Sequence, residues 1–334
     1  MAFPKLIAVY GATGAQGGSV VQSLLQNKDH AFAIRGISRN PDSEKARALA
    51  THGVDMVQAD GFNKEQMLAA FKGCWGAFIN TNSDDSSVNQ PGGPSEEDLG
   101  KIVMDAAAEA GVKHIVYSSM ISVTDLTKGA VPAISFDHKH AIGQYAVHKG
   151  VFETVNLISP GWYMENHLLE ELAPALGGWP LVPDEEGYLT LRVPRWGGNE
   201  KIPFIAIGED WGDLVHGALL HPEKYNGKLV HGMSQESTAS ELVDIFVEVT
   251  GKKSRYIPIE DWRTFETYGE GALDTVKHMF GFCQYSGGLY YAERNDLAAP
   301  SELKRIAAEA RGLRGEDATL LTLKSFFMRN FPKE

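Results

Sequence analysis

The stretch of sequence that decides the fold is Gly11-Ala-Thr-Gly14-Ala-Gln-Gly17-Gly18. It follows a short apolar run at residues 6–10 and opens an apolar, helical stretch at residues 17–26. Glycine at these spacings permits a tight turn and close packing of a helix on a strand. The N–H groups at the start of such a helix attract an anion. A strand, a glycine turn and a helix in this order predict a turn that binds the pyrophosphate of a dinucleotide.

A glycine turn of this kind can also be purely structural, so the rest of the chain has to support the prediction. Short β-rich runs alternate with helical stretches through the first 160 residues, with further strands expected at residues 33–38, 56–58, 77–80, 114–117 and 154–158. Alternation of this kind builds a parallel sheet with helices on both faces. We therefore predict an α/β protein, with a Rossmann-type doubly wound parallel sheet in a domain formed by residues 1–159.

One predicted helix of this domain has unusually clear end signals. Ser95 followed by Asp98 forms a capping pattern, and Gly111 has the position of a residue that ends a helix. The sequence therefore predicts a helix at residues 96–110.

The second half of the chain has a looser pattern. Glycines, prolines and tryptophans interrupt the alternation after Pro160-Gly161. We predict a smaller, irregular α+β domain at residues 160–334 that serves as a substrate or partner region. Residues 202–207 and 228–232 are expected to return to the main sheet as strands, and residues 301–329 to form a docked pair of helices. The segment at residues 263–300 has no clear assignment.

Composition excludes several classes of protein. With 43% hydrophobic and 22% charged residues, the chain can form a large core. The 31 basic and 43 acidic residues give a net charge of −12, which repels phosphate backbones and argues against direct binding of nucleic acid. Cys74 and Cys283 form neither a disulfide framework nor a zinc-binding spacing, so we expect no metal site.

Hydropathy bears on the location of the protein. The sequence contains no apolar run of the roughly 20 residues that a membrane span needs. It also begins without a basic stretch followed by a long apolar segment. We expect a soluble, monomeric or homodimeric protein of the cytoplasm, with the nucleus as an additional compartment, and no membrane contact.

A second signal indicates which dinucleotide would bind. Ser38 and Arg39 stand at the end of the second predicted strand, where NAD-binding sites place an acidic residue for the ribose hydroxyl. A carboxylate there would repel a 2′-phosphate, whereas a guanidinium attracts it through charge-assisted hydrogen bonds. The sequence therefore favours NADP(H), and the alternative is that Arg39 is an ordinary surface arginine.

Two further segments follow predicted strands. Asp60-Gly61 is expected near the adenine and Asn80-Thr81 near a cofactor ribose, because ligands of open α/β sheets bind at the carboxyl ends of strands. Asp60 has a second interpretation as a residue that only caps the helix after Asn63. The cofactor-binding residues predicted in this domain are Gly11, Thr13, Gly14, Gln16, Gly17, Ser38, Arg39, Asp60, Gly61, Asn80 and Thr81.

The sequence resembles the NmrA-like group of atypical short-chain dehydrogenase/reductases, which includes NmrA regulators and NmrA-like NADPH sensors. The matching segments are Gly11-Ala-Thr-Gly-Ala-Gln-Gly17, Ser38-Arg-Asn-Pro41, Ala77-Phe-Ile-Asn-Thr-Asn82, Val116-Tyr-Ser-Ser119, Phe136-Asp-His-Lys139, Pro160-Gly-Trp-Tyr-Met-Glu-Asn166 and His221-Pro-Glu-Lys-Tyr-Asn-Gly227. The resemblance implies an NADP(H) site that also includes Lys139, Pro160, Tyr163 and Asn166.

The tyrosine–lysine pair of mainstream short-chain dehydrogenases has no clear counterpart. Tyr145 and Lys149 have the required spacing, but Lys149 stands only 11 residues before Pro160, too close for a helix and a strand to intervene. Lys139 stands 21 residues before Pro160 and is the better counterpart. Ser135 then occupies the position of the proton-donating tyrosine.

The remaining catalytic candidates are Lys139, Ser118 and Tyr163. In reductases that resemble this chain, the lysine is implied as a general acid or base, although it can equally serve only as a hydrogen-bond donor to the ribose. His138 and His140 flank Lys139 and are expected to be surface or capping residues rather than proton relays. The aromatic residues Trp162, Tyr163, Trp179 and Trp196 can line a substrate pocket or form ordinary core.

Two functions remain open from the sequence. The first is a redox sensor, in which NADP(H) occupancy regulates a protein partner, and this requires different affinities for the oxidised and reduced cofactor. The missing tyrosine and the acidic surface favour it slightly. The alternative is an NADPH-dependent reductase of a small aromatic or enone-type substrate that uses Lys139, and the intact glycine turn supports this function.

Overall fold

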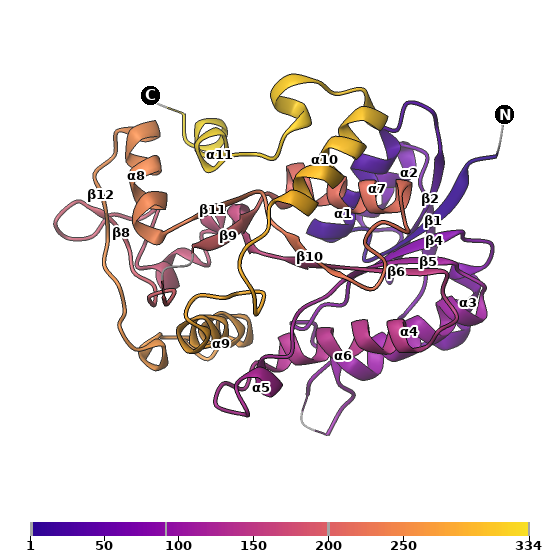
Figure 1. Cartoon of the computed structure of the whole chain (residues 1–334), viewed down its shortest axis with the longest axis horizontal. Coiled ribbons are helices and arrows are strands. Elements are labelled where there is room, and N and C mark those ends of the chain that lie inside the picture. Colours follow the sequence, from indigo (N-terminus) through magenta and orange to yellow (C-terminus); the bar gives the residue numbers. More distant parts are fainter. Residues whose placement is uncertain (1–2, 91, 199–200, 333–334) are drawn as a thin grey trace.

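A computed structural model describes residues 3–90, 92–198 and 201–332 (Figure 1). Its centre is a seven-stranded sheet in the order β10-β6-β5-β4-β1-β2-β3, and every neighbouring pair is parallel. The strands are β1 (Lys5–Tyr10), β2 (Phe32–Ser38), β3 (Asp55–Gln58), β4 (Gly76–Ile79), β5 (His114–Ser118), β6 (Thr154–Pro160) and β10 (Leu229–Gly232). The strand order reverses between β1 and β4, and ligands of open α/β sheets bind at such a point.

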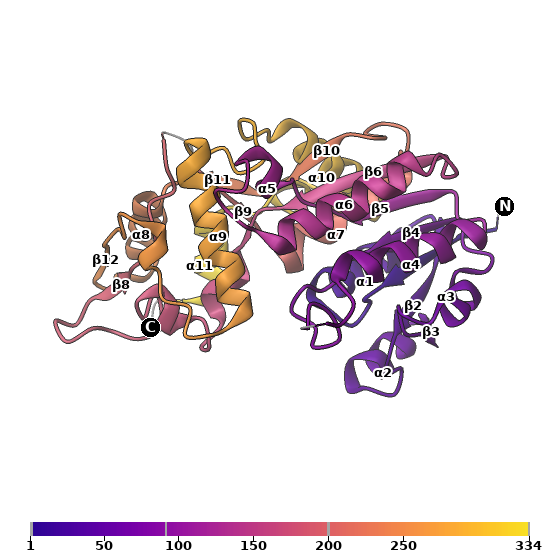
Figure 2. The ribbon, with the colours of Figure 1, turned by 90° about the horizontal axis from the view of Figure 1, so that it is seen from below.

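Helices cover both faces of this sheet (Figures 1 and 2). One face carries α1 (Ala15–Leu25), α2 (Glu44–Thr51), α7 (Gly212–Leu220) and α10 (Ala298–Arg311), and the other carries α3 (Lys64–Phe71), α4 (Glu96–Glu109) and α6 (Ile134–His148). Successive side chains of a strand point to opposite faces. In β1, Ile7 and Val9 accordingly join the core under α1 and α7, and Ala8 joins the core under α3, α4 and α6. The predicted doubly wound α/β fold is confirmed.

Local signals explain where α4 begins. The Ser95 side chain accepts a hydrogen bond from the Asp98 N–H, and the Asp98 carboxylate accepts one from the Ser95 N–H, which forms a reciprocal capping box. Gly111 follows the helix with a φ of +80°, a conformation that favours glycine. The helix predicted at residues 96–110 therefore forms where the sequence placed its ends.

The second half of the chain builds a smaller, mixed part with its own core around Trp179, Phe204, Phe246, Phe280 and Phe327. It contains a three-stranded sheet in the order β11-β9-β7 and a two-stranded sheet of β12 and β8. The strands are β7 (Trp162–Tyr163), β8 (Leu189–Leu191), β9 (Ile202–Ile205), β11 (Gln235–Ser237) and β12 (Ser254–Tyr256). Its helices are α8 (Ala239–Thr250), α9 (Gly271–Ser286) and α11 (Leu323–Asn330). Helix α5 (Val123–Leu126), from the first half of the chain, adds Val123 to the same core.

One sequence prediction needs correction here. Residues 202–207 were expected to return to the main sheet, but β9 pairs with β7 and β11 instead. Of the two candidate segments, only residues 229–232 lie beside β6, as β10. Gly161 helps to explain the difference, because a Cβ at this position would lie 2.4 Å from the Pro203 carbonyl oxygen. The chain after β6 thus approaches β9 closely and pairs with it through β7.

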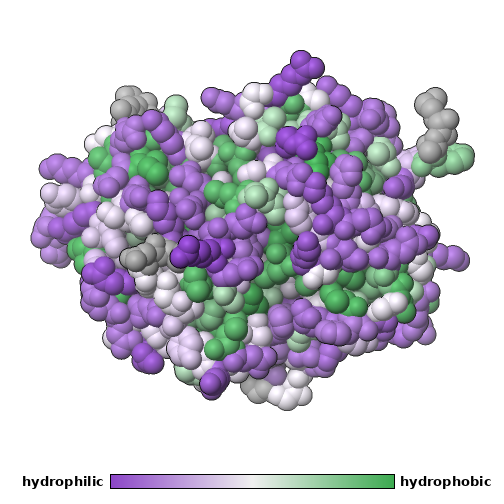
Figure 3. All heavy atoms as spheres, viewed as in Figure 1, coloured by the Kyte–Doolittle hydropathy of each residue, from purple (hydrophilic) through white to green (hydrophobic). Residues whose placement is uncertain are grey.

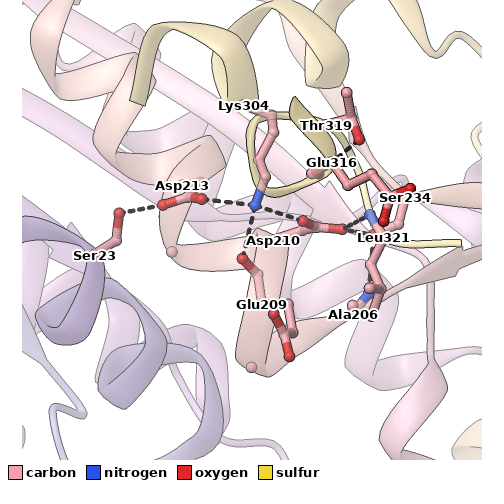
Figure 4. Close-up of polar contacts among 12 residues, drawn as sticks. Ser23, Ala206, Glu209, Asp210, Asp213, Ser234, Lys304, Glu316, Thr319 and Leu321 are labelled. Carbon is pink, nitrogen blue, oxygen red and sulfur yellow. Dashed lines mark hydrogen bonds and ion pairs between the residues drawn. The ribbon is translucent and has the colours of Figure 1, made fainter. Parts of the chain in front are cut away.

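The C-terminal helices are joined to the first half by buried charges (Figure 4). Lys304 of α10 is 4% exposed. Its Nζ lies 2.8 Å from Asp210 Oδ1 and 2.8 Å from Asp213 Oδ2. Asp213 also accepts a hydrogen bond from Ser23 of α1. Because α7, β10 and α10 follow residue 160 yet pack on the first half, the two parts of the chain exchange elements across the predicted boundary.

One face of the molecule is largely polar (Figure 3). On the face shown in Figure 3, hydrophilic residues predominate and hydrophobic residues form patches between them. None of the described helices has both the length and the hydropathy needed to cross a membrane.

Candidate functional site

The glycine turn connects β1 to α1 and leaves backbone N–H groups without side-chain partners. Gly11 has a φ of +81°, and its carbonyl accepts a hydrogen bond from the Gly14 N–H at 3.0 Å. A Cβ at Gly17 would lie 2.2 Å from the Gly11 carbonyl oxygen, so only glycine allows the helix to pack this closely. Gly14 is the N-cap of α1 and provides no side-chain cap. The first N–H groups of α1 can therefore bind an anion.

A cavity of about 340 Å³ opens beside this turn, at the carboxyl ends of β1, β2 and β3. Six residues predicted from the sequence line it: Gly11, Thr13, Ser38, Arg39, Asp60 and Asn80. Asp60 also accepts a hydrogen bond from the Phe62 N–H at 2.9 Å, while Asn63 is the N-cap of α3. Asp60 therefore shapes the turn before α3 and lines the cavity as well.

Arg39 has a partner in this cavity that the sequence analysis missed. Its guanidinium donates two hydrogen bonds to Asp85, with Nη1–Oδ1 at 3.1 Å and Nη2–Oδ2 at 2.5 Å. Burial raises the pKa of Asp85, but the hydrogen bonds from Arg39 and Ser87 outweigh it and lower the pKa to about 2. Asp85 carried no sequence signal, because it stands 46 residues from Arg39.

A second cavity, of about 760 Å³, lies between the carboxyl ends of β4, β5 and β6 and helix α9. Eight residues predicted from the sequence line it: Gln16, Asn80, Thr81, Ser118, Lys139, Pro160, Tyr163 and Asn166. Asn80 and Asn82 line both cavities. The two cavities therefore adjoin along the carboxyl edge of the sheet, across the point where the strand order reverses.

Three predicted residues lie outside the described linings of both cavities. Gly14 and Gly17 shape the turn through their backbone, as described above. Gly61 allows close packing, because a Cβ there would lie 2.3 Å from Tyr10 Oη.

Lys139 extends from α6 into the larger cavity and is held by three oxygen atoms. Its Nζ lies 2.6 Å from Glu96 Oε1, 2.5 Å from the Thr81 carbonyl oxygen and 3.2 Å from Thr81 Oγ1. Glu96 is completely buried, and its second oxygen, Oε2, has no hydrogen-bond partner among the described residues. The Thr81 hydroxyl donates to Glu96 Oε1 at 2.6 Å. This arrangement places a charge-compensated ammonium group at the wall of the cavity.

Glu96 carries no sequence signal that links it to Lys139. The residue follows the N-cap Ser95, and an acidic residue in the first turn of a helix is common because it interacts favourably with the helix dipole. This local role conceals the contact with Lys139, which lies 43 positions later in the chain.

Tyr163 and Ser118 provide two further hydroxyl groups at the larger cavity. Tyr163 Oη accepts a hydrogen bond from Gln16 Nε2 at 2.6 Å. Burial raises the pKa of Tyr163 to about 12, so its hydroxyl keeps the proton near neutral pH. Ser118 Oγ and Gln16 Oε1 are buried without a hydrogen-bond partner in the described part of the chain. Buried polar atoms without partners are unusual in folded proteins and suit a site that receives a polar ligand.

Tyr145 and Lys149 form a separate contact, away from the linings of both cavities. Tyr145 Oη and Lys149 Nζ lie 2.6 Å and 2.7 Å from Asp105 Oδ1 on α4. Ser135, at the position of the missing tyrosine, lines the larger cavity and its Oγ lies 3.0 Å from Thr275 Oγ1 of α9. The geometry agrees with the expectation that Tyr145 and Lys149 are not a catalytic pair.

Helix α9 forms the apolar wall opposite the sheet and lies in the segment that had no sequence assignment. Leu273, Val276 and Met279 of α9 line the larger cavity together with Phe136 and Trp162. The signal was present, because Leu273, Val276, Phe280 and Cys283 follow helical spacing. Of the other predicted aromatic residues, Trp179 and Trp196 belong to the core of the smaller part.

Known proteins share the sequence pattern and the fold of this chain. A family model described as the NmrA-like family matches residues 4–308. The chain belongs to the NmrA-like family. Among similar members is the NmrA-like family domain-containing oxidoreductase FrzB of Cladobotryum sp., which is 50% identical over 98% of this chain and 99% of its own length. The corresponding oxidoreductase hkm9 of Aspergillus hancockii is 47% identical over 98% of this chain and 97% of its own.

Solved structures of similar fold include both regulators and enzymes. The negative transcriptional regulator NmrA in complex with NADP has a TM-score of 0.71 at 19% identity, covering 98% of this chain and 97% of NmrA. The NADPH-dependent quinone oxidoreductase QOR2 of Escherichia coli, complexed with NADPH, has a TM-score of 0.69 at 22% identity, covering 97% of this chain and 99% of QOR2. At these identities the likeness establishes the shared fold.

Proposed function

We propose that this member of the NmrA-like family is an NADP(H)-dependent reductase of a small, apolar substrate of aromatic or enone type. The observation that carries the proposal is the position of Lys139, whose ammonium group lies at the wall of a cavity that adjoins the glycine turn. Relatives at 50% and 47% identity are named oxidoreductases. They support the reductase more than the redox sensor that the sequence alone slightly favoured.

The residues of the smaller cavity fit an NADP(H) adenosine and pyrophosphate. The first turn of α1 offers N–H groups to the pyrophosphate. Arg39 offers a guanidinium to the 2′-phosphate, and Asp60 lies where it can meet the adenine. Gln16 Oε1 and Ser118 Oγ, which are buried without partners in the described structure, can receive polar groups of the nicotinamide half. The bound cofactor supplies the hydride for reduction.

The lining of the larger cavity indicates the kind of substrate. Side chains such as Phe136, Trp162, Leu273, Val276 and Met279 make much of its wall apolar. A volume of about 760 Å³ falls within the range of small-molecule sites, which are mostly apolar with a few convergent polar groups. A flat aromatic or enone-type molecule would bury its body against α9 and present its reducible group to the polar edge.

Three polar groups at that edge can act on the substrate. Tyr163 keeps its proton near neutral pH and can donate a hydrogen bond to an oxygen that gains charge during reduction. Lys139 can turn the N–H that it directs to Thr81 Oγ1, at 3.2 Å, toward the same oxygen and donate a hydrogen bond or a proton, and Glu96 compensates the ammonium charge before any proton is transferred. Ser118 can orient the nicotinamide or the substrate.

Binding of the cofactor is tested first, by calorimetric titration of the purified protein with NADPH, NADP+, NADH and NAD+ at one salt concentration. We expect the phosphorylated cofactors to bind more tightly, with similar affinity for NADPH and NADP+. A large difference between NADPH and NADP+ would support the sensor instead. Absence of binding by all four would contradict the proposal.

Turnover is tested by NADPH oxidation at 340 nm with a panel of quinones and enones, beginning with menadione. Lys139→Ala should reduce kcat by about 100-fold or more, the contribution of a positioned acid or base, and should change the Kd of NADPH only a few-fold. Lys149→Ala is the matched control, because Lys149 lies at the end of the same helix and binds Asp105. Normal turnover by Lys139→Ala would remove Lys139 from the mechanism.

A further inference from the structure

We propose that Asp85 is a specificity-determining residue for the cofactor, because it competes with the 2′-phosphate of NADP(H) for Arg39. The inference rests on the proposed function, in which NADP(H) occupies the smaller cavity. Asp85 lines the smaller cavity, although it belongs neither to the glycine turn nor to a strand end. The inference gives this carboxylate a role.

The geometry of the pair is that of direct competition. Both nitrogen atoms of the Arg39 fork bind the two oxygen atoms of Asp85, at 3.1 Å and 2.5 Å. A phosphate uses the same fork in the same bidentate manner. While these two donors remain on Asp85, a 2′-phosphate can use only the other N–H groups of the guanidinium, so it must displace or share them to bind the same end of the fork.

Asp85 is a well-held competitor. Its Oδ1 also accepts hydrogen bonds from the Ser87 N–H at 2.9 Å and the Ser87 hydroxyl at 2.6 Å. Its pKa of about 2 keeps the carboxylate ionised at every pH where the protein would be assayed. Arg39, by contrast, is 60% exposed along its side chain, and Asp85 is only 15% exposed. The arginine is therefore the mobile partner that can turn toward a ligand.

Charge makes the competition selective between cofactors. Asp85 and Ser87 line the same cavity as Arg39 and Ser38, so the carboxylate faces the space assigned to the ribose. A dianionic 2′-phosphate there is repelled by Asp85 and competes with it for Arg39. The hydroxyl of NAD(H) meets neither cost. Asp85 therefore lowers the preference for NADP(H) below the level that Arg39 alone would produce.

The test is calorimetric titration of Asp85→Asn with NADPH and NADH at one ionic strength, because exposed charges are screened by salt. Asparagine keeps an oxygen for Ser87, but it replaces the oxygen that accepts from Arg39 Nη2 with an NH2 group, so it removes the charge and one of the two hydrogen bonds to Arg39. Because the Arg39 side chain of the ion pair is 60% exposed, the pair contributes little, so we expect the Kd of NADPH to fall by about 2- to 5-fold, or about 0.4–1 kcal/mol at 1.4 kcal/mol per tenfold. The Kd of NADH should stay within about 1.5-fold.

Asp42→Asn is the matched control, because it removes the same charge from an exposed position in the loop that follows Arg39. It should leave the ratio of the two affinities nearly unchanged. Unchanged or weaker binding of NADPH by Asp85→Asn would overturn the inference and would mean that Asp85 orients Arg39 for the phosphate. If the unmodified protein binds NADPH but Asp85→Asn does not bind it more tightly, only this inference is lost. If the unmodified protein does not bind NADPH, the proposed function is lost as well.

Discussion

Lys139→Met should destabilise the folded protein far more than its partly exposed position suggests, because it isolates a buried charge. The Glu96 side chain is 0% exposed, whereas Lys139 is 12% exposed. With lysine removed, the Glu96 carboxylate keeps only the Thr81 hydroxyl among the partners that the structure describes. Removing one partner of a buried ion pair costs about 3–5 kcal/mol, and we expect a loss of stability in this range.

Glu96→Gln should cost less, for a reason that is visible in the structure. Glutamine keeps an oxygen for Thr81 and Lys139, and the lysine can turn toward the solvent in the larger cavity. We expect a loss of about 1.5–3 kcal/mol, the range for a hydrogen bond to a charged group. The double variant removes both charges, so its loss should be smaller than the sum of the two single losses by about 2 kcal/mol.

The assay is urea unfolding of the cofactor-free variants at pH 7, followed by tryptophan fluorescence. Lys149→Met and Asp105→Asn form the matched control cycle, because their pair also joins α6 to α4 but is 25% and 33% exposed. That pair should contribute no more than about 1 kcal/mol. If Lys139→Met costs as little as Lys149→Met, or if the Glu96 and Lys139 losses simply add, the buried pair does not hold the site together as we argue.

Two further predictions concern regions outside the site. Lys304→Met leaves Asp210 without its buried cation, whereas Asp213 keeps its ion pair with Arg311, so urea unfolding should show a loss of about 3–5 kcal/mol, against less than about 1 kcal/mol for Lys324→Met in an exposed pair. Burial lowers the pKa of His167 from 6.5 to about 4, so the native state favours the neutral imidazole. The stability that the neutral His167 side chain contributes is complete above about pH 6.5 and is lost as the pH falls toward 4. His167→Gln should therefore reduce the slope of the unfolding free energy against pH by about 1.4 kcal/mol per pH unit between about pH 4 and pH 6.5. An unchanged slope would contradict a buried, neutral His167.

Several features of the site were accessible from the sequence because their signals are local. The glycine turn needs only neighbouring residues, since Gly11, Gly14 and Gly17 lie within one strand–helix junction. Strand ends are also local features, and Arg39, Asn80 and Thr81 follow theirs directly. A parallel sheet brings such ends to one edge, which explains why residues predicted separately line two adjoining cavities. Their roles in binding and catalysis remain predictions for the experiments above.

Other features were beyond the sequence for a physical reason. Residues 202–207 and 228–232 are both short apolar runs, and the sequence does not show which of them pairs with β6 in the main sheet. The partners of Arg39 and Lys139 are carboxylates 46 and 43 residues away. Many acidic residues of this chain carry the same local signals as Asp85 and Glu96, so only the folded arrangement distinguishes them.

By itself, the sequence determined the α/β architecture, the glycine turn and the edge of the sheet at which polar residues gather, because hydrophobic periodicity and backbone geometry act over a few residues. Tertiary structure alone decided that α9 lines the larger cavity, that Glu96 forms an ion pair with Lys139, and that Asp85 forms an ion pair with Arg39. These contacts join distant segments. Their energies depend on burial and on distances of a few ångströms, which exist only once the chain has folded.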